Sequence, residues 1–183
     1  MSLKHAILAM LDIEEGSGYD LVKRFNKSIG YFWSSSYQQV YRDLKALEDL
    51  SLISSKEIVQ VGKPDKKLLR ITDPGLEELK NWLEKPSKPM KVKEPLLVKL
   101  FAGRLMKKEV LLAEIDRHKL HHQETLEKYL RLTEELEQME EPRKTRYQFP
   151  YQTLQLGIHI EKAWLEWADE TSKNIQSMDD LDN

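Results

Sequence analysis

The chain has 183 residues, no cysteine, and 29 Lys and Arg against 31 Asp and Glu. The lack of cysteine excludes disulfides, iron–sulfur clusters, thiolate zinc sites and cysteine nucleophiles, and the balanced charge excludes a long basic tail for nucleic acid. The apolar stretch at residues 6–11 is too short for a secretion signal or a membrane span, so we expect a cytoplasmic protein with no membrane partner. Glycine and proline are few, at 7 each, and long segments show helical spacing of apolar residues, which predicts a mainly α fold.

The N-terminal half is predicted to begin with three helices separated by turn-forming residues. The first is expected to end before Gly16, and the second, capped by Ser17 or the glycine after it, near Lys27. The third follows three serines at 34–36 and continues to about Leu50.

A β-hairpin and a fourth helix are expected to follow. Two β-prone runs flank a turn at 62–65, so residues 53–72 should pair as a hairpin, and Asp73 and Pro74 should be the N-cap and first residue of the next helix. These are the elements of a winged helix-turn-helix domain, in which the third helix enters the DNA major groove and the hairpin, or wing, follows the backbone. Small helical domains with a hairpin also serve as protein-interaction modules. The residue types on the exposed face of the third helix are therefore needed to decide between DNA binding and protein binding.

The third helix has a core face and an opposite face that suits DNA. Three apolar residues, spaced four and three apart from Val40, fall within about 60° of one another and are expected to be buried. Gln38, Arg42 and Lys45 fall opposite them. Arg and Gln can bind guanine and adenine edges bidentately, while serine hydroxyls and helix N-terminal amides suit phosphate oxygens. An ordinary solvated face is the alternative interpretation.

The hairpin adds a local excess of positive charge. Between Lys56 and Arg70 there are five basic residues against two acidic ones, which suits phosphate contacts, although exposed lysines also protect a sheet edge against aggregation. Tyr37, beside the predicted reading face, is expected only to pack. The predicted DNA-binding residues are Ser34, Ser35, Ser36, Gln38, Gln39, Tyr41, Arg42, Lys45, Lys63, Lys66 and Lys67.

Three motifs in this half resemble the PadR family of bacterial transcriptional regulators. They are Tyr-Asp-Leu at 19–21, Tyr-Arg-Asp-Leu-Lys-Ala-Leu-Glu at 41–48 and Ile-Thr-Asp-Pro-Gly at 71–75. The chain departs from the family pattern at Ser51, where many members have glycine, and we expect this serine to distort the start of the wing.

The second half resembles the longer, AphA-like members of the same family in residues 94–105 and 156–167. The resemblance covers nearly the whole chain. It implies a homodimeric repressor, or less often an activator, whose N-terminal winged helix binds a palindromic operator and whose antiparallel C-terminal helices dimerise. Its double-stranded DNA partner and the second copy of the chain would thus be held by different halves.

A stretch with three prolines and several lysines separates the two halves. It predicts a DNA-binding domain at 1–85, a linker at 86–94 and a helical dimerisation domain at 95–183. In the last of these, residues 107–139 read as one helix with a heptad seam, apolar at both ends. A helix of roughly 50 Å is too long for burial in one small domain and needs a partner surface.

A final helix is expected at about 151–171, with residues 172–183 frayed. Its wide apolar side carries two tryptophans and should pack on the long helix and on another subunit. The residues predicted to support dimerisation are Leu111, Ile115, Tyr129, Leu132, Leu136, Ile160, Trp164 and Trp167.

Other functions have weaker support in the sequence. His118, His121 and His122 could share a metal, but no matching ligand pair appears except the isolated His159 with Glu161, so we expect no metal and no other cofactor. No catalytic motif is present, so we expect no enzyme.

Two alternatives to an operator-binding regulator stay open. One is a protein-interaction module that has lost DNA affinity, and the other is a protein that mainly binds aromatic ligands. The family resemblance implies that some members release DNA on meeting a small aromatic effector, for which stacking surfaces would be Trp33, Trp82 and Phe101. These rings could equally fill only core and interface.

Overall fold

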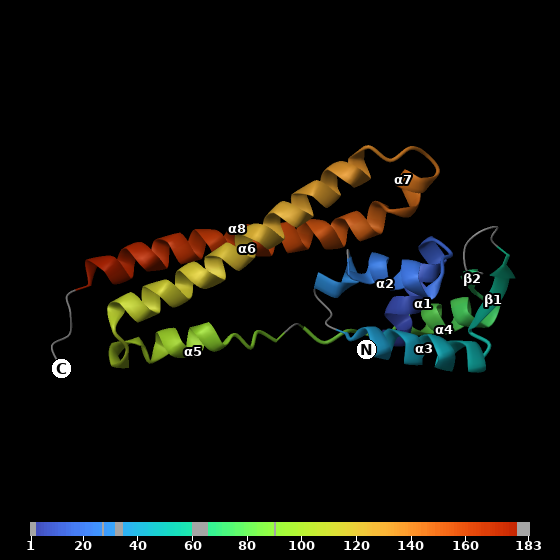
Figure 1. The fold of residues 1–183 in the computed structure, drawn as a ribbon, viewed down its shortest axis with the longest axis horizontal. Coiled ribbons are helices and arrows are strands. Elements are labelled where there is room, and N and C mark those ends of the chain that lie inside the picture. The colour runs from blue at the N-terminus through green and yellow to red at the C-terminus, as the bar shows by residue number, and fades with distance from the viewer. Residues whose placement is uncertain (1–2, 27, 32–34, 60–65, 90, 179–183) are drawn as a thin grey trace. The chain divides into compact units, whose positions relative to one another are not determined.

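The computed structural model describes residues 3–26, 28–31, 35–59, 66–89 and 91–178. The chain divides into two compact units, Met1–Lys88 and Pro89–Asn183, each with its own hydrophobic core (Figure 1). Helices form most of both units, and the described strands form a two-stranded antiparallel sheet in the N-terminal unit. The predicted mainly α fold with a hairpin wing is confirmed. None of the described helices combines the length and the hydropathy that crossing a bilayer requires.

The N-terminal unit begins with three α-helices and a short 3-10 turn. They are α1 (Leu3–Ile13), α2 (Gly18–Asn26), η1 (Ile29–Tyr31) and α3 (Tyr37–Asp49). Ser36 is the N-cap of α3, and its side chain accepts a hydrogen bond from the amide of Gln39, one of the donors that a helix start leaves unpaired. Val40, Leu44 and Leu47 are buried in the core, as their spacing predicts.

The wing consists of β1 (Ile53–Ile58) and β2 (Lys66–Ile71), and α4 (Asp73–Leu83) follows it. The strands are antiparallel, with Ile53 opposite Ile71. The N-cap of α4 is Thr72 and not Asp73, contrary to the prediction from the sequence. The Thr72 hydroxyl accepts a hydrogen bond from the Gly75 amide at 3.2 Å and donates one to the Ser51 carbonyl at 2.8 Å, so this side chain joins α4 to the start of the wing.

Ser51 lies just after α3 and adopts a left-handed backbone conformation, with φ of 56°. The Ser51 amide donates to the Glu48 carbonyl and the Leu52 amide to the Leu47 carbonyl, each at 2.9 Å. This pair of bonds is the Schellman arrangement, in which glycine is favoured because it has no Cβ. The departure from glycine therefore places a strained residue between α3 and the wing.

Replacing Ser51 with glycine should stabilise the N-terminal unit by about 1 kcal/mol, because it removes the steric cost of the left-handed conformation. Urea unfolding followed by circular dichroism measures this change. Glycine at the exposed strand residue Ser54 is the control and should destabilise. An unchanged or lowered urea midpoint for Ser51→Gly would show that Ser51 bears no strain.

The C-terminal unit is built on two long antiparallel helices that lie side by side (Figure 1). Its elements are α5 (Pro95–Phe101), η2 (Gly103–Leu105), α6 (Lys108–Glu137), α7 (Arg143–Arg146) and α8 (Gln148–Ser177). A buried cluster of α5, α6 and α8 residues joins them, formed by Leu96, Leu111, Ile115, Ala168 and Ile175.

The last helix is longer than its predicted extent of 151–171 at both ends. Pro150 stands in its first turn, where a helix does not need the amide hydrogen that proline lacks. Residues 172–177 are helical and not frayed, because Ile175 is buried against the α5 and α6 side chains. Residues 179–183, also expected to be frayed, lie outside the described part of the chain.

Candidate nucleic-acid interface

The α3 face opposite the core is open to solvent. Gln38, Gln39, Arg42 and Lys45 are all exposed, and the Arg42 side chain is 75% accessible. The Arg42 Nε lies 4.0 Å from the Asp43 carboxylate, a loose contact, and Lys45 forms no ion pair with any residue that the structure describes. This face therefore presents uncommitted donors on one side of the helix.

The serines before α3 have different environments. Ser36 caps the helix, and the Ser35 hydroxyl is buried with no hydrogen-bond partner among the described residues. Ser34 and the wing residue Lys63, both predicted to bind DNA, lie outside the described residues.

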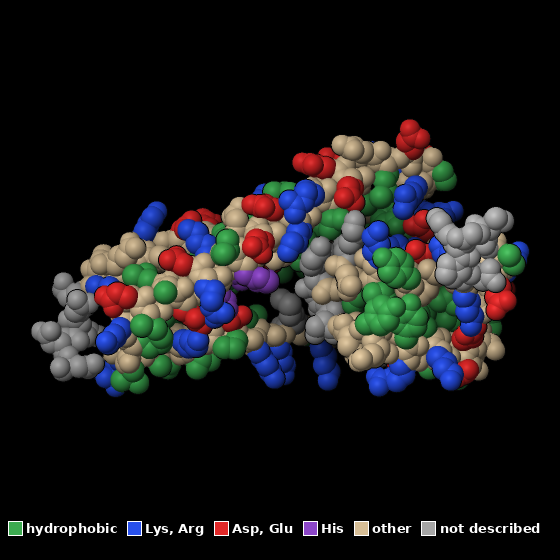
Figure 2. Space-filling view, in the orientation of Figure 1, with side chains coloured by type: hydrophobic (Ala, Val, Ile, Leu, Met, Phe, Trp, Pro, Cys, Tyr) green, Lys and Arg blue, Asp and Glu red, His purple; other side chains and the backbone are tan. Residues whose placement is uncertain are grey.

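Two tyrosines at the start of α3 form a pair beside this face. The Tyr37 hydroxyl donates to the Tyr41 hydroxyl at 3.1 Å, and the ring centroids are 4.6 Å apart. Gly18 at the start of α2 packs against Tyr41, since a Cβ there would lie 2.9 Å from the ring. Burial, which disfavours the charged phenolate, raises the pKa of Tyr41 to about 12, so its hydroxyl keeps its proton. Figure 2 shows hydrophobic side chains gathered on the N-terminal unit around α2 and α3.

The basic residues of β2 are held by acids from the helices. The Lys66 Nζ lies 2.8 Å from the Asp20 carboxylate of α2, and the Lys67 Nζ lies 2.9 Å from the Glu48 carboxylate of α3. Arg70 pairs in the same way with Glu15, in the loop before α2. Sequence reasoning missed these pairs, because their members are far apart in the chain and only the folded wing brings them together.

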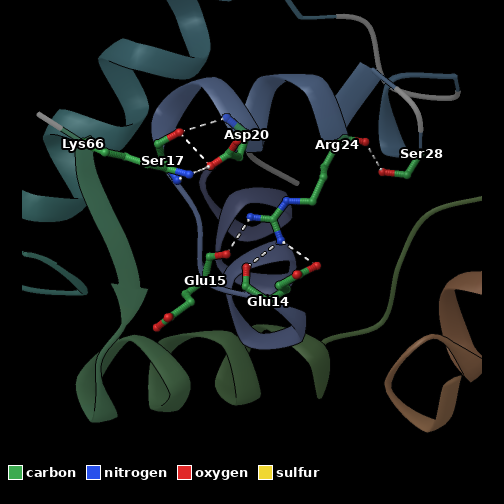
Figure 3. Close-up of polar contacts among 7 residues, drawn as sticks. All are labelled: Glu14, Glu15, Ser17, Asp20, Arg24, Ser28 and Lys66. Atoms are coloured by element: carbon green, nitrogen blue, oxygen red, sulfur yellow. Dashed lines mark hydrogen bonds and ion pairs between the residues drawn. The ribbon is translucent and has the colours of Figure 1, made fainter. Parts of the chain in front are cut away.

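Asp20 is fixed in place by its own helix (Figure 3). The Ser17 amide and hydroxyl both donate to its carboxylate, at 2.9 and 2.8 Å, and the Asp20 amide donates back to the Ser17 hydroxyl at 3.2 Å. This reciprocal capping pairs the free amides at the helix start. The bond from Lys66 is the largest cause that lowers the pKa of Asp20 to about 2, so this carboxylate is ionised at neutral pH.

The turn between α1 and α2 is fastened to both α2 and the wing. The Arg24 guanidinium donates to the carbonyl oxygens of Glu14 and Glu15, at 2.7 and 3.2 Å (Figure 3). Gly16 exchanges two backbone hydrogen bonds with Leu69 of β2, at 3.2 and 2.9 Å. Backbone hydrogen bonds therefore join β2 to the turn between α1 and α2, in addition to the side-chain ion pairs.

The residues considered for an effector belong to different units. In the N-terminal unit Trp82 stacks on His5 with ring centroids 4.7 Å apart, and in the C-terminal unit Phe101 is 97% exposed. Trp33 lies outside the described residues.

The histidines of α6 contact residues of α8. The His122 Nδ1 lies 2.5 Å from the carboxylate of Glu161, a buried residue, and its ring stacks on Trp164 at 3.8 Å. His118 stacks on the same tryptophan at 5.9 Å. Figure 2 shows histidine side chains where α6 and α8 cross. Within the described ranges no group of three His, Asp or Glu side chains is arranged to hold a metal ion, so these contacts join the two helices.

The heptad seam of α6 packs within its own unit. Leu111, Ile115 and Tyr129 are buried in the single chain, the first two in the core shared with α5 and α8. These three side chains have almost no surface left for a second subunit, so this part of the seam has its apolar partner within the chain. Dimerisation through the rest of the seam stays a prediction. Of the other residues proposed for dimerisation, Leu132, Leu136, Trp164 and Trp167 are half-buried and Ile160 is exposed.

Two sequence profiles match the chain. The Transcriptional regulator PadR-like family matches residues 7–81, and the Virulence activator alpha C-term family matches residues 92–176. The Mycobacterium tuberculosis protein Rv1176c is 29% identical over 96% of this chain and 98% of its own length.

Solved structures agree with these matches. Bacillus subtilis PadR in complex with operator DNA has 28% identity and a TM-score of 0.80, over 94% of this chain and 98% of that chain. The same protein with p-coumaric acid has 27% identity and a TM-score of 0.77, over 96% of each chain. The Vibrio cholerae virulence activator AphA has 26% identity and a TM-score of 0.74, over 97% of this chain and all of that chain. The chain therefore combines a PadR-like transcriptional regulator domain at residues 7–81 with a Virulence activator alpha C-term domain at residues 92–176, as PadR and AphA homologues do.

Proposed function

We propose that the chain is a homodimeric repressor that binds a palindromic operator. The observation that carries the proposal is the α3 face, where exposed Gln38, Arg42 and Lys45 point away from the core with no strong intramolecular partner. In this proposal residues 1–85 bind DNA, 86–94 connect, and 95–183 dimerise. The fold similarity to PadR bound to operator DNA supports this assignment.

The α3 side chains match the chemistry of groove reading. The planar guanidinium of Arg42 can donate two parallel bonds to guanine O6 and N7, and the Gln38 amide can pair with adenine N6 and N7. The exposed Gln39 and the tyrosine pair at the helix start can reach phosphates on either side of the groove. The wing lysines Lys66 and Lys67 lie on β2, which would follow the backbone.

A dimer explains why such a small reading surface can be selective. One α3 helix contacts only a few base pairs, and two helices related by a two-fold axis read two half-sites about 34 Å apart. Linking the two DNA-binding domains in one dimer multiplies the affinity for the operator without a new contact. A protein-interaction module without DNA affinity would show neither sequence selectivity nor a gain in DNA affinity from dimerisation. Enrichment of an inverted repeat from genomic fragments would distinguish the regulator from such a module.

Arg42→Ala should cost about 1 to 3 kcal/mol of binding free energy at the operator and relax specificity at one base position of each half-site. The measurement is fluorescence anisotropy on operator duplexes, selected from genomic fragments, with every base varied in turn. Lys80→Ala, which removes an exposed positive charge from α4, is the control and should leave the base preferences unchanged. Equal losses on all sequences for Arg42→Ala would show that α3 does not read bases.

Release by a small aromatic effector stays a prediction. It is supported by the fold similarity to PadR in complex with p-coumaric acid. Of the two considered aromatic residues that the structure describes, Trp82 already stacks on a histidine, and Phe101 is 97% exposed. An effector can act only if it binds the DNA-free arrangement of the dimer more tightly than the DNA-bound one.

A further inference from the structure

We propose that Asp20 and Glu48 are specificity-determining residues: they neutralise Lys66 and Lys67 in the free protein and so limit affinity for DNA of any sequence. The inference rests on the proposed DNA-binding function and deepens it. It divides the basic residues of the interface into two groups. Residues of the first group are unpaired and can contact DNA directly, whereas residues of the second group are paired with a carboxylate that DNA must displace.

Glu48 holds both strands of the wing with one carboxylate. Its Oε1 accepts a hydrogen bond from the Ser55 hydroxyl of β1 at 2.5 Å, and its Oε2 accepts one from the Lys67 ammonium of β2 at 2.9 Å. These two bonds, the one from Ser55 first, lower the pKa of Glu48, so the carboxylate stays ionised when it faces Lys67. Each carboxylate oxygen of Glu48 accepts one hydrogen bond, and the two bonds together hold the wing to α3.

Asp20 meets Lys66 with a carboxylate that is placed independently of the lysine. The amide and hydroxyl of Ser17 already fix it at the start of α2, and the Lys66 ammonium then approaches to 2.8 Å. The first two residues of β2 are therefore neutralised by two different helices, α2 and α3. Each lysine is thus neutralised by a carboxylate, with which a DNA phosphate would have to compete.

The α3 face is different. Lys45 has no ion pair within the described residues, and Arg42 has only its loose contact with Asp43 at 4.0 Å. The α3 face thus carries unpaired positive charge. The three cations of β2, Lys66, Lys67 and Arg70, are all paired, whereas Lys56 of β1 has no ion pair among the described residues.

Counterion release explains why this difference affects specificity. Each phosphate neutralised by a protein cation adds about 0.9 to the slope of log affinity against log salt, whatever the sequence. A lysine that keeps its carboxylate releases few counterions, so Lys66 and Lys67 add little to binding on random DNA. The Lys67 and Glu48 side chains are 54% and 33% exposed, and ion pairs of this kind are weak enough for a well-placed operator phosphate to replace the acid.

Glu48→Gln tests the inference directly. The amide keeps an acceptor for Ser55 but loses the charge that neutralises Lys67. On a mixed-sequence duplex of about 30 base pairs, affinity at about 50 mM KCl should rise several-fold and the salt slope should steepen by about 0.9. Asp49→Asn makes the same change in net charge one residue away, at an exposed acid with no ion pair among the described residues, and should leave the slope unchanged.

A double mutant shows whether the effect passes through the lysine. In a Lys67→Gln background, Glu48→Gln should change neither affinity nor slope. Thermal unfolding checks that each variant folds. If Glu48→Gln does not fold, Lys67→Gln and Lys45→Gln still decide: Lys45→Gln should lower the slope on the mixed-sequence duplex by about 0.9, and Lys67→Gln by less than half of that.

The outcomes separate this inference from the proposed function. If the wild-type chain binds no duplex, both are overturned. If it binds and Lys45→Gln lowers the slope, but Glu48→Gln behaves as Asp49→Asn does or binds more weakly, the DNA-binding function stands. In that case Glu48 only supports the wing mechanically, and the inference fails.

Discussion

Replacing Gly75 with alanine is expected to destabilise the N-terminal unit by about 3 kcal/mol. A Cβ at this position would lie 2.0 Å from the carbonyl oxygen of Leu52 and 2.9 Å from the Ile71 side chain. The Leu52 oxygen belongs to the backbone and accepts a hydrogen bond from the Thr72 amide at 3.1 Å, so it cannot rotate away. The first turn of α4 and the start of the wing would have to separate.

Urea unfolding of the full chain, followed by circular dichroism, measures the loss. Gly103→Ala is the control, because a Cβ there meets only the Leu111 side chain, at an ordinary contact distance of 3.4 Å. We expect Gly75→Ala to lower the midpoint of the N-terminal unit and Gly103→Ala to change little. An unchanged midpoint for Gly75→Ala would mean that α4 can shift away from the wing without loss of packing.

The same junction shows what the sequence could predict and what it could not. The pattern of residues 71–75 predicts a helix start, and the helix begins there, because capping is a local property of a few neighbouring residues. Thr72 and Asp73 are both good caps, however, and sequence alone does not say which one is used. The choice depends on the Ser51 carbonyl, which the fold brings to the Thr72 hydroxyl.

Ion pairs between residues far apart in the chain cannot be predicted from the sequence pattern. The spacing from Val40 predicts the buried face of α3 correctly, because helical periodicity is fixed by backbone geometry. The pairs Lys66–Asp20 and Lys67–Glu48 join residues from separate elements and leave no periodic signal. An excess of lysines on the wing therefore suggests free positive charge where the folded domain has ion pairs.

The heptad spacing of α6 is ambiguous for a related reason. Apolar residues at heptad spacing show that a helix needs an apolar partner, but they do not say whether that partner is another subunit or a later helix of the same chain. Ile115 is fully buried against α5 and α8 side chains, so the partner is internal there. A dimer contact must use side chains that the C-terminal unit leaves exposed.

One face of α8 has such side chains. Leu156 and Ile160 are four residues apart and are 62% and 40% exposed, and Phe149 lies seven residues before Leu156 and is also exposed. Residues at this spacing fall on the same side of a helix. An exposed apolar stripe on a rigid helix is the kind of surface that a second copy of the chain would cover.

If the chain forms the proposed homodimer through this stripe, the double substitution of Leu156 and Ile160 by glutamate is expected to yield a monomer of 21.6 kDa. Four carboxylates would then face one another across a two-fold interface, where each would lose water without gaining a partner. Because the two DNA-binding domains would no longer be linked, the affinity for the operator should fall by at least about 100-fold. Sedimentation velocity measures the mass, and anisotropy on operator and half-site duplexes measures the loss.

Gln176→Glu is the matched control, since it adds one negative charge to an exposed residue near the end of the same helix, away from the stripe. It should leave mass and operator affinity unchanged. The double variant should still bind a single half-site as the wild type does, because the N-terminal unit carries the reading helix and has its own core. A double variant that stays dimeric, with full operator affinity, would exclude this face of α8 from the interface and leave the exposed residues of α5 and α6 as the surfaces to test.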